Sequence, residues 1–175
     1  MHAIEDHKRI IALLKHEVVP AMGCTEPVAV ALCAARAAEL LGTLPERVKV
    51  ELSMNVLKNA MGVGIPGTGM IGLPIAIFLG MRIGKSSYGL EVLKDNHAQA
   101  VEEGKQYIEE GRISIALDEN APDGLYIKVH AEGDGRTSEA IICGEHTRFI
   151  YEAIDDEVLR KEDVKARASE EHDEP

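Results

Sequence analysis

The stretch TEPVAVALCAARAAELLG, residues 25–42, is an apolar, alanine-rich run bounded by helix signals. Thr25 is a suitable capping residue, Pro27 falls in the first turn, where a missing N–H costs little, and Gly42 supplies a C-terminal stop. Apolar side chains occur around most of the helix circumference. Residues 28–41 therefore predict a helix that is buried at the centre of the fold.

The segments on both sides of this helix predict a mixed fold. Residues 4–19 carry apolar side chains at helical spacing, and residues 95–111 predict a further surface helix. Residues 47–54, RVKVELSM, alternate strictly and predict a half-buried strand. Four more strands are predicted, at residues 113–117, 125–131, 137–142 and 147–151. Their turn signals suggest an antiparallel meander, so we expect an α+β fold with helices on a mostly antiparallel sheet.

The chain of 175 residues has the length of one domain. Residues 1–154 are interpreted as an N-terminal domain, and residues 155–175 as a charged, partly disordered tail or linker. Within this tail, residues 158–164 suggest one helical turn or more.

Composition restricts the classes of partner. A formal net charge of −11 disfavours nucleic acid and anionic membranes, because both bind through Lys and Arg. The first ten residues mix charges and lack the apolar segment of a secretory signal. Three cysteines, an odd number, argue against a disulfide framework. These features together predict a cytoplasmic protein.

Residues 59–84 are rich in glycine, and we expect a structured loop to about Gly72, followed by a short buried helix that begins near Pro74. The segments 62–67 and 67–72 match the dinucleotide-binding fingerprint, but that motif requires a strand directly before it and a crossover helix after it. We therefore do not predict nicotinamide binding. The loop N–H groups and the Thr68 hydroxyl could bind a carboxylate, or the glycines could simply allow close packing.

Cys24 directly precedes the central helix. Unpaired N–H groups and the helix dipole at this position favour a thiolate, which can act as a nucleophile or a metal ligand. The alternative is a small buried side chain. Cys33 and Cys143 are predicted to lie in the core, and the absence of C-x-x-C spacing excludes a self-contained metal site.

Two further positions are candidates for chemistry. His146 lies in CGEHT, residues 143–147, a polar turn between two predicted strands. Lys58 and Asn59 lie between a strand and the glycine loop, where they could serve as a base or a carboxylate-binding pair. The alternative for Lys58 is an ordinary solvated side chain.

Several motifs in a shared order resemble the N-terminal part of the L-cysteine desulfidase family, which is related to the alpha chain of iron–sulfur L-serine dehydratases. The motifs are PAMGCTEP at 20–27, KN at 58–59, GVGIPGTGMIGLP at 62–74, GLEVLKD at 89–95 and GEHT at 144–147. The resemblance covers roughly residues 8–150. Joint motifs at matching intervals are more specific than any one alone.

The resemblance implies a pyridoxal-free lyase that eliminates the side-chain group of a small amino acid. The products would be pyruvate and ammonia, plus sulfide from cysteine, and the complete enzyme would use a [4Fe–4S] cluster. In this family Cys24 would be the metal ligand, and Lys58 and His146 the catalytic candidates. The substrate-binding candidates are Asn59, Gly67, Thr68 and Gly69.

The chain also departs from the family. Family members are more than twice as long, and their remaining cluster cysteines lie in the half that is absent here. The expected partners are therefore a missing C-terminal half or partner subunit, in a homo-oligomer, and no cluster is expected in this chain alone. Glu145 and Arg148 differ from the family pattern around His146. The alternative is a non-catalytic structural or small-anion-binding module that needs a partner domain.

Overall fold

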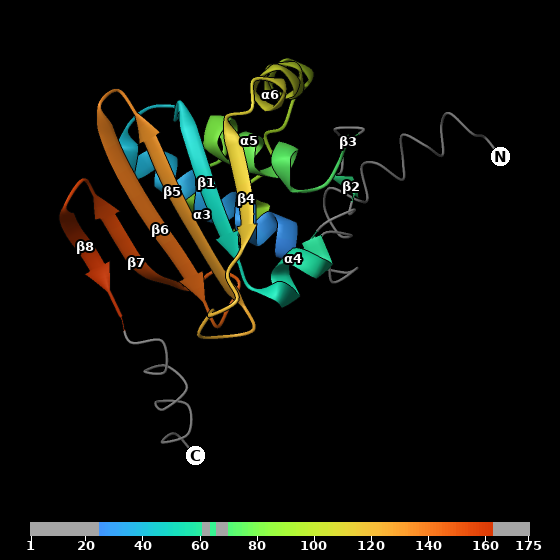
Figure 1. The fold of residues 1–175 in the computed structure, drawn as a ribbon. Helices are drawn as coiled ribbons and strands as arrows, with labels where there is room; N and C mark the ends of the chain where they lie inside the picture. Colours follow the sequence, from blue (N-terminus) through green and yellow to red (C-terminus); the bar gives the residue numbers. More distant parts are fainter. Residues whose placement is uncertain (1–24, 61–63, 66–69, 163–175) are drawn as a thin grey trace.

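The computed structural model describes residues 25–60, 64–65 and 70–162, which form an α+β fold with helices on one face of a six-stranded sheet (Figure 1). The predicted fold class and the central alanine-rich helix are confirmed. The helix expected over residues 4–19 and the end of the acidic tail lie outside the described residues.

The helices are α3 (Thr25–Leu41), α4 (Met54–Ala60), α5 (Leu73–Ile83) and α6 (Ala98–Glu109), with a 3₁₀ helix, η2 (Ser86–Glu91). The strands of the main sheet are β1 (Arg47–Leu52), β4 (Ile113–Leu117), β5 (Tyr126–Gly133), β6 (Arg136–Cys143), β7 (Phe149–Ile154) and β8 (Glu157–Lys161). A separate two-stranded sheet joins β2 (Gly64–Ile65) and β3 (Met70–Ile71).

The strand order in the main sheet is β4-β1-β5-β6-β7-β8. β1 pairs parallel with β4 on one side and antiparallel with β5 on the other. The prediction of one antiparallel meander over residues 113–151 is therefore wrong for β4. The early strand β1 lies between β4 and β5, and its alternating Val48, Val50 and Leu52 are buried in the core.

Two other local predictions need correction. The segment after β1 turns at Ser53 and forms α4, so the strand expected to reach residue 54 ends at Leu52. The helical turn expected near residues 158–164 is instead strand β8 over Glu157–Lys161. Arg160 on β8 reaches the buried Glu152 carboxylate of β7, with Nε 3.3 Å from Oε2. This ion pair and the β7–β8 hydrogen bonds extend the sheet past residue 154.

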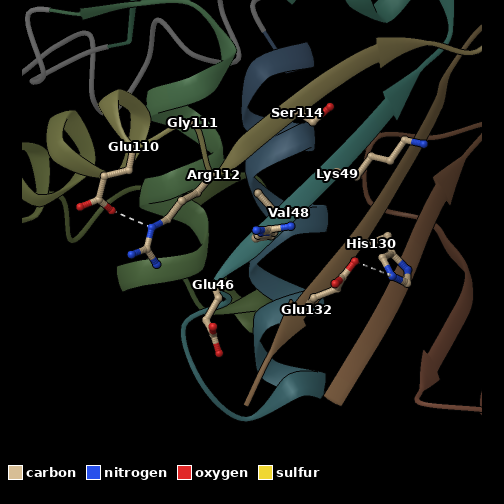
Figure 2. Close-up of a pocket in the computed structure, with 10 residues that line it drawn as sticks. Glu46, Val48, Lys49, Glu110, Gly111, Arg112, Ser114, His130 and Glu132 are labelled. Carbon is tan, nitrogen blue, oxygen red and sulfur yellow. Dashed lines mark ion pairs between the residues drawn. The ribbon is translucent and has the colours of Figure 1, made fainter. Parts of the chain in front are cut away.

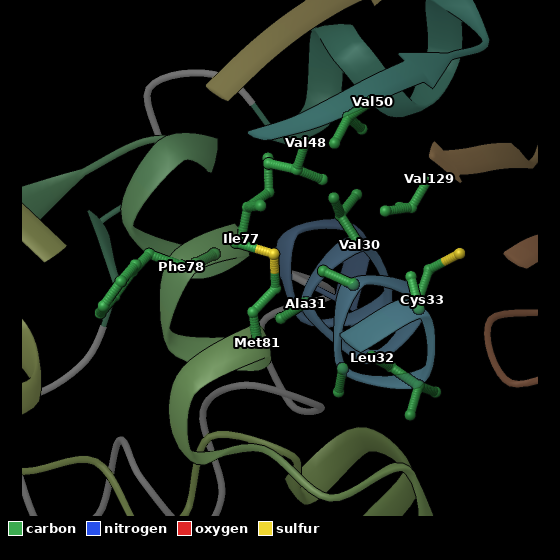
Figure 3. Close-up of a cluster of buried hydrophobic side chains, with 14 of the residues drawn as sticks. Val30, Ala31, Leu32, Cys33, Val48, Val50, Ile77, Phe78, Met81 and Val129 are labelled. Atoms are coloured by element: carbon green, nitrogen blue, oxygen red, sulfur yellow. The ribbon is translucent and has the colours of Figure 1, made fainter. Parts of the chain in front are cut away.

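The middle of α3 is covered on all sides. Residues 29–35 are each at most 1% exposed, which a helix of 3.6 residues per turn can only achieve with neighbours all around it. One side packs on β5 and β6 and another on α5 (Figures 1 and 3), and a third packs on η2. The predicted core position of Cys33 is confirmed. Its side chain is buried, and its thiol points at the sheet and lies 3.3 Å from the carbonyl oxygen of Ala140.

The close contact of α3 with α5 depends on Gly80. A Cβ built at Gly80 would lie far inside van der Waals distance of the Ala31 carbonyl oxygen, and 2.9 Å from the Ala31 carbonyl carbon. Both atoms belong to the backbone and have no alternative rotamer. The two helices therefore touch backbone to backbone, and a side chain at this position would push them apart.

We expect Gly80→Ala to lower the free energy of unfolding by about 3 kcal/mol, because overpacking at rigid backbone cannot be relieved locally. Gly124→Ala is the matched control, since nothing lies within 4 Å of a Cβ at that glycine. The control should change the free energy of unfolding by less than about 0.5 kcal/mol. Urea unfolding of both variants measures this difference, and equal stabilities would show that α5 can shift away from α3.

Candidate functional site

Two of the sequence motifs meet at the start of α3. Glu26 lies in the first turn of the helix, and His146 lies in the turn between β6 and β7. The Nε2 atom of His146 is 3.3 Å from Oε2 of Glu26, although the residues are 120 positions apart in the chain. The glutamate side chain is 15% exposed and the histidine 35%, so the pair is half-buried but accessible.

The turn that carries His146 is held by its own backbone. Gly144 has a φ of 84°, in the left-handed region that favours glycine, and its N–H donates to the carbonyl of Leu125 at 2.9 Å. Arg148 N–H closes the turn by donating to the carbonyl of Glu145 at 3.1 Å. The imidazole is therefore presented toward α3 by a fixed loop.

A carboxylate beside an imidazole fixes which ring nitrogen carries the proton and stabilises the imidazolium once it forms. Such a pair is suited to accept and return a proton. The pair thus combines a titratable group with a partner that orients it.

Lys58 and Asn59 lie at the C-terminal end of α4, and both side chains are exposed. α4 packs against α3, and Figure 1 shows it at the same end of the sheet as the start of α3. Three predicted residues, Lys58, Asn59 and His146, are therefore on one side of the molecule. Among the described residues, Lys58 makes no ion pair.

The remaining candidates are not described. Cys24, Gly67, Thr68 and Gly69 lie outside the residues that the structure describes. The distance between Cys24 and the glycine loop decides whether the two could share a site. Both ends of that distance lie outside the described residues. Their roles remain predictions.

The two described cysteines lie on opposite faces of the sheet. Cys33 packs with the helices, whereas Cys143 belongs to a small cluster with Tyr126 and Ile150 on the other face. Burial raises the pKa of the Cys143 thiol to about 11, and burial in apolar surroundings raises the pKa of Cys33 further above its usual range. Both thiols are therefore protonated at neutral pH.

The positions of the two cysteines show whether the described residues could hold an iron–sulfur cluster. A cluster needs several thiolates that converge. Cys33 and Cys143 do not converge, and within residues 25–60, 64–65 and 70–162 no three His, Cys, Asp or Glu side chains gather as a metal site. The described residues therefore do not supply a ligand set for a [4Fe–4S] cluster.

A pocket of about 560 Å³ lies elsewhere, on the open face of the sheet (Figure 2). It is formed where β1 and β4 begin and where β5 ends, which is the opposite end of the sheet from Glu26 and His146. Its lining includes Arg47, Lys49, Ser114, His130 and Glu132. Sequence reasoning did not select this site, although the alternation in RVKVEL places Arg47 and Lys49 on one face.

The pocket holds charges of both signs. Arg112 Nε is 2.6 Å from the Glu110 carboxylate, and His130 Nε2 is 3.8 Å from that of Glu132. Arg47 and Lys49 make no ion pair with any residue in the described part of the chain. These two cations are therefore available to an anion that enters the pocket.

No family model and no solved structure matches the chain. None of the described helices has both the length and the apolar character needed to cross a bilayer.

The chain is similar to several curated UPF0597 proteins. A UPF0597 protein of Bacteroides fragilis is 62% identical over 154 residues, which cover 88% of this chain and 36% of the relative. A relative in Phocaeicola vulgatus is 57% identical over 175 residues, all of this chain and 41% of that protein. One in Aeromonas hydrophila is 48% identical over 153 residues, 87% of this chain and 34% of that protein. The chain is therefore closely similar to UPF0597 proteins along its own sequence, and spans about two fifths or less of their length.

Proposed function

We propose that this chain is the N-terminal portion of a [4Fe–4S]-dependent, pyridoxal-free amino-acid lyase. The activity would be of the L-cysteine desulfidase or L-serine dehydratase type, giving pyruvate and ammonia, plus sulfide when the substrate is cysteine. The observation that carries the proposal is the contact of His146 with Glu26. It joins the CTEP and GEHT motifs, two of those on which the resemblance rests.

The length of the relatives supports the same proposal. The chain covers 36% to 41% of the UPF0597 proteins from Bacteroides fragilis and Phocaeicola vulgatus. Since the described residues do not supply a cluster ligand set, Cys24 and residues beyond this chain would have to provide it.

The proposed roles of this chain's own residues follow from their positions. His146, oriented by Glu26, would move a proton at its Nε2 or Nδ1 atom. Lys58 is an exposed ammonium group on the neighbouring helix, where it could attract a substrate carboxylate or act as a base. Asn59 and the glycine loop at Gly67, Thr68 and Gly69 would hold the carboxylate with neutral donors.

A chimera tests the activity. The region of the Phocaeicola vulgatus relative that matches this chain would be replaced by the 175-residue chain, and the product reconstituted anaerobically with iron and sulfide. We expect visible absorbance from the cluster and release of pyruvate from L-cysteine or L-serine. The isolated chain should show neither. A cluster-loaded chimera and relative that are inactive on both amino acids would contradict the proposed function.

Two histidine variants of the chimera test the role of His146. His146→Gln should lower kcat by about 10²-fold, because a positioned acid–base group is lost, while cluster absorbance is unchanged. His130→Gln is the matched control, since both histidines are 35% exposed and both lie 3.3 Å from a glutamate oxygen. Equal kcat values for the two variants would remove His146 from the catalytic candidates.

A second candidate function is a small-anion-binding module. The pocket on the open face favours it, because Arg47 and Lys49 line that pocket without an ion pair among the described residues. In this case the chain would bind an anion at the far end of the sheet from His146, without catalysis.

Phosphate titration followed by amide NMR shifts tests this candidate. Arg47→Gln with Lys49→Gln should weaken phosphate binding by at least about tenfold, because charge-assisted hydrogen bonds are removed. The control pair Lys105→Gln with Arg136→Gln removes the same charge from residues that already face carboxylates. An equal loss in both pairs would indicate nonspecific attraction to positive charge and not a site.

A further inference from the structure

The two edges of the main sheet are built differently. β8 forms one edge, and all five of its residues are exposed. It carries Glu157, Arg160 and Lys161, and its pairing with β7 is irregular between Glu152 and Ala153. Charged side chains and register shifts are the usual means by which proteins prevent an edge strand from pairing with another chain. The β8 edge is therefore protected.

β4 forms the other edge and has none of these protections. Its sequence, ISIAL, contains no charge, no proline and no glycine, and its pairing with β1 is regular from Ile113 to Leu117. In the described part of the chain no strand lies on its outer side. Figure 1 shows it as the outermost strand at that side of the sheet. Regular, uncharged edge strands readily pair with a further strand.

The hydrogen bonds to β1 define which backbone groups of β4 face outward. Val48 N–H donates to the carbonyl of Arg112 at 3.0 Å, and Asp118 N–H donates to the carbonyl of Leu52 at 2.8 Å. In a parallel ladder the bonded residues alternate, so the even-numbered positions face β1. The N–H and C=O groups of Ile113, Ile115 and Leu117 consequently point away from the sheet.

We propose that β4 pairs antiparallel with β4 of a second copy of this chain, about a twofold axis at Ile115. In this register Ile115 faces its own copy, and Ile113 faces Leu117 of the other copy. All outward backbone groups of the strand then find partners, which no register shifted along the strand achieves. The two six-stranded sheets join into one continuous sheet.

Side-chain chemistry agrees with this register. Ile113, Ile115 and Leu117 point to the helix face, where Ile113 and Ile115 already pack on the core. Directly opposite residues share a face, so the apolar side chains of the two copies would meet there. Ser114 and Ala116 point to the open face and would lie opposite each other. No like charges are placed in opposition along the strand.

Charge complementarity at the strand ends favours a second copy as the occupant. The register centred on Ile115 places Arg112, just before the strand, opposite Asp118 of the other copy, just after it. The same pair forms twice because of the twofold axis. The Arg112 side chain is 41% exposed, pairs with Glu110 and lies over the Tyr107 ring, so its guanidinium has donors left for a second carboxylate.

A pair of charge variants on the open face tests the interface. Ser114→Glu with Ala116→Glu would place like charges opposite each other twice, whereas Ser114→Glu with Ala116→Lys would place opposite charges there. Sedimentation velocity of the 175-residue chain should show a dimer. We expect the first variant to raise the dimer dissociation constant on the order of tenfold relative to the second. A monomeric wild-type chain, or equal dissociation constants, would overturn the proposal.

Cross-linking tests the register independently of stability. Residues 114 and 116 would form a pair without direct hydrogen bonds, with Cα atoms about 4.5 Å apart, within the range for a disulfide. Ser114→Cys with Ala116→Cys should give a disulfide-linked dimer on mild oxidation. Ser114→Cys alone should not, because residue 114 is not opposite its own copy. Both variants carry Cys24→Ser, and Cys33 and Cys143 are buried. Equal cross-linking yields would contradict this register.

Discussion

The backbone contact between α3 and α5 at Gly80 is the constraint on which the rest of the fold depends. It allows α5 to lie so close to α3 that the small side chains of the alanine-rich helix still leave no gap. With α5 on one side and β5 and β6 on the other, residues 29–35 of α3 are fully enclosed. The position of its first turn is then fixed by packing, and with it the position of Glu26. The contact of Glu26 with His146 is thus a consequence of how the core is packed.

Much of the fold could be predicted from sequence because its signals are local. The central helix is marked by Pro27 and Gly42, and strand residues 113–117 by their composition and neighbouring turns. The position of β1 between β4 and β5 could not be predicted, because alternation defines a strand but not its neighbours. α4 follows β1 after one residue and leaves no separate turn signal. The charges of residues 155–175 suggested a tail with a helical turn near residues 158–164, whereas the pairing of β8 with β7 depends on the tertiary structure.

The candidate site could likewise be predicted only where its signals are local in sequence. The motifs around Glu26 and His146 were visible in sequence, but their contact spans 120 positions and depends on the whole sheet. The pocket at Arg47 and Lys49 was missed, since β1, β4 and β5 contribute to it from separate parts of the chain. The two locations lie at opposite ends of the sheet. The proton transfer proposed at one and the anion binding proposed at the other therefore involve separate parts of this chain.

The enclosure of α3 also has a consequence for synthesis of the protein. Cys33 on this helix contacts Ala140 of β6, which is made 107 residues later. At ordinary translation rates that interval is roughly 5 to 20 s. During most of this interval, the side of α3 that packs on β5 and β6 has no sheet to cover it. Until then the apolar surface of the nascent helix can associate with other chains, so slow elongation between residues 42 and 125 would favour aggregation over folding.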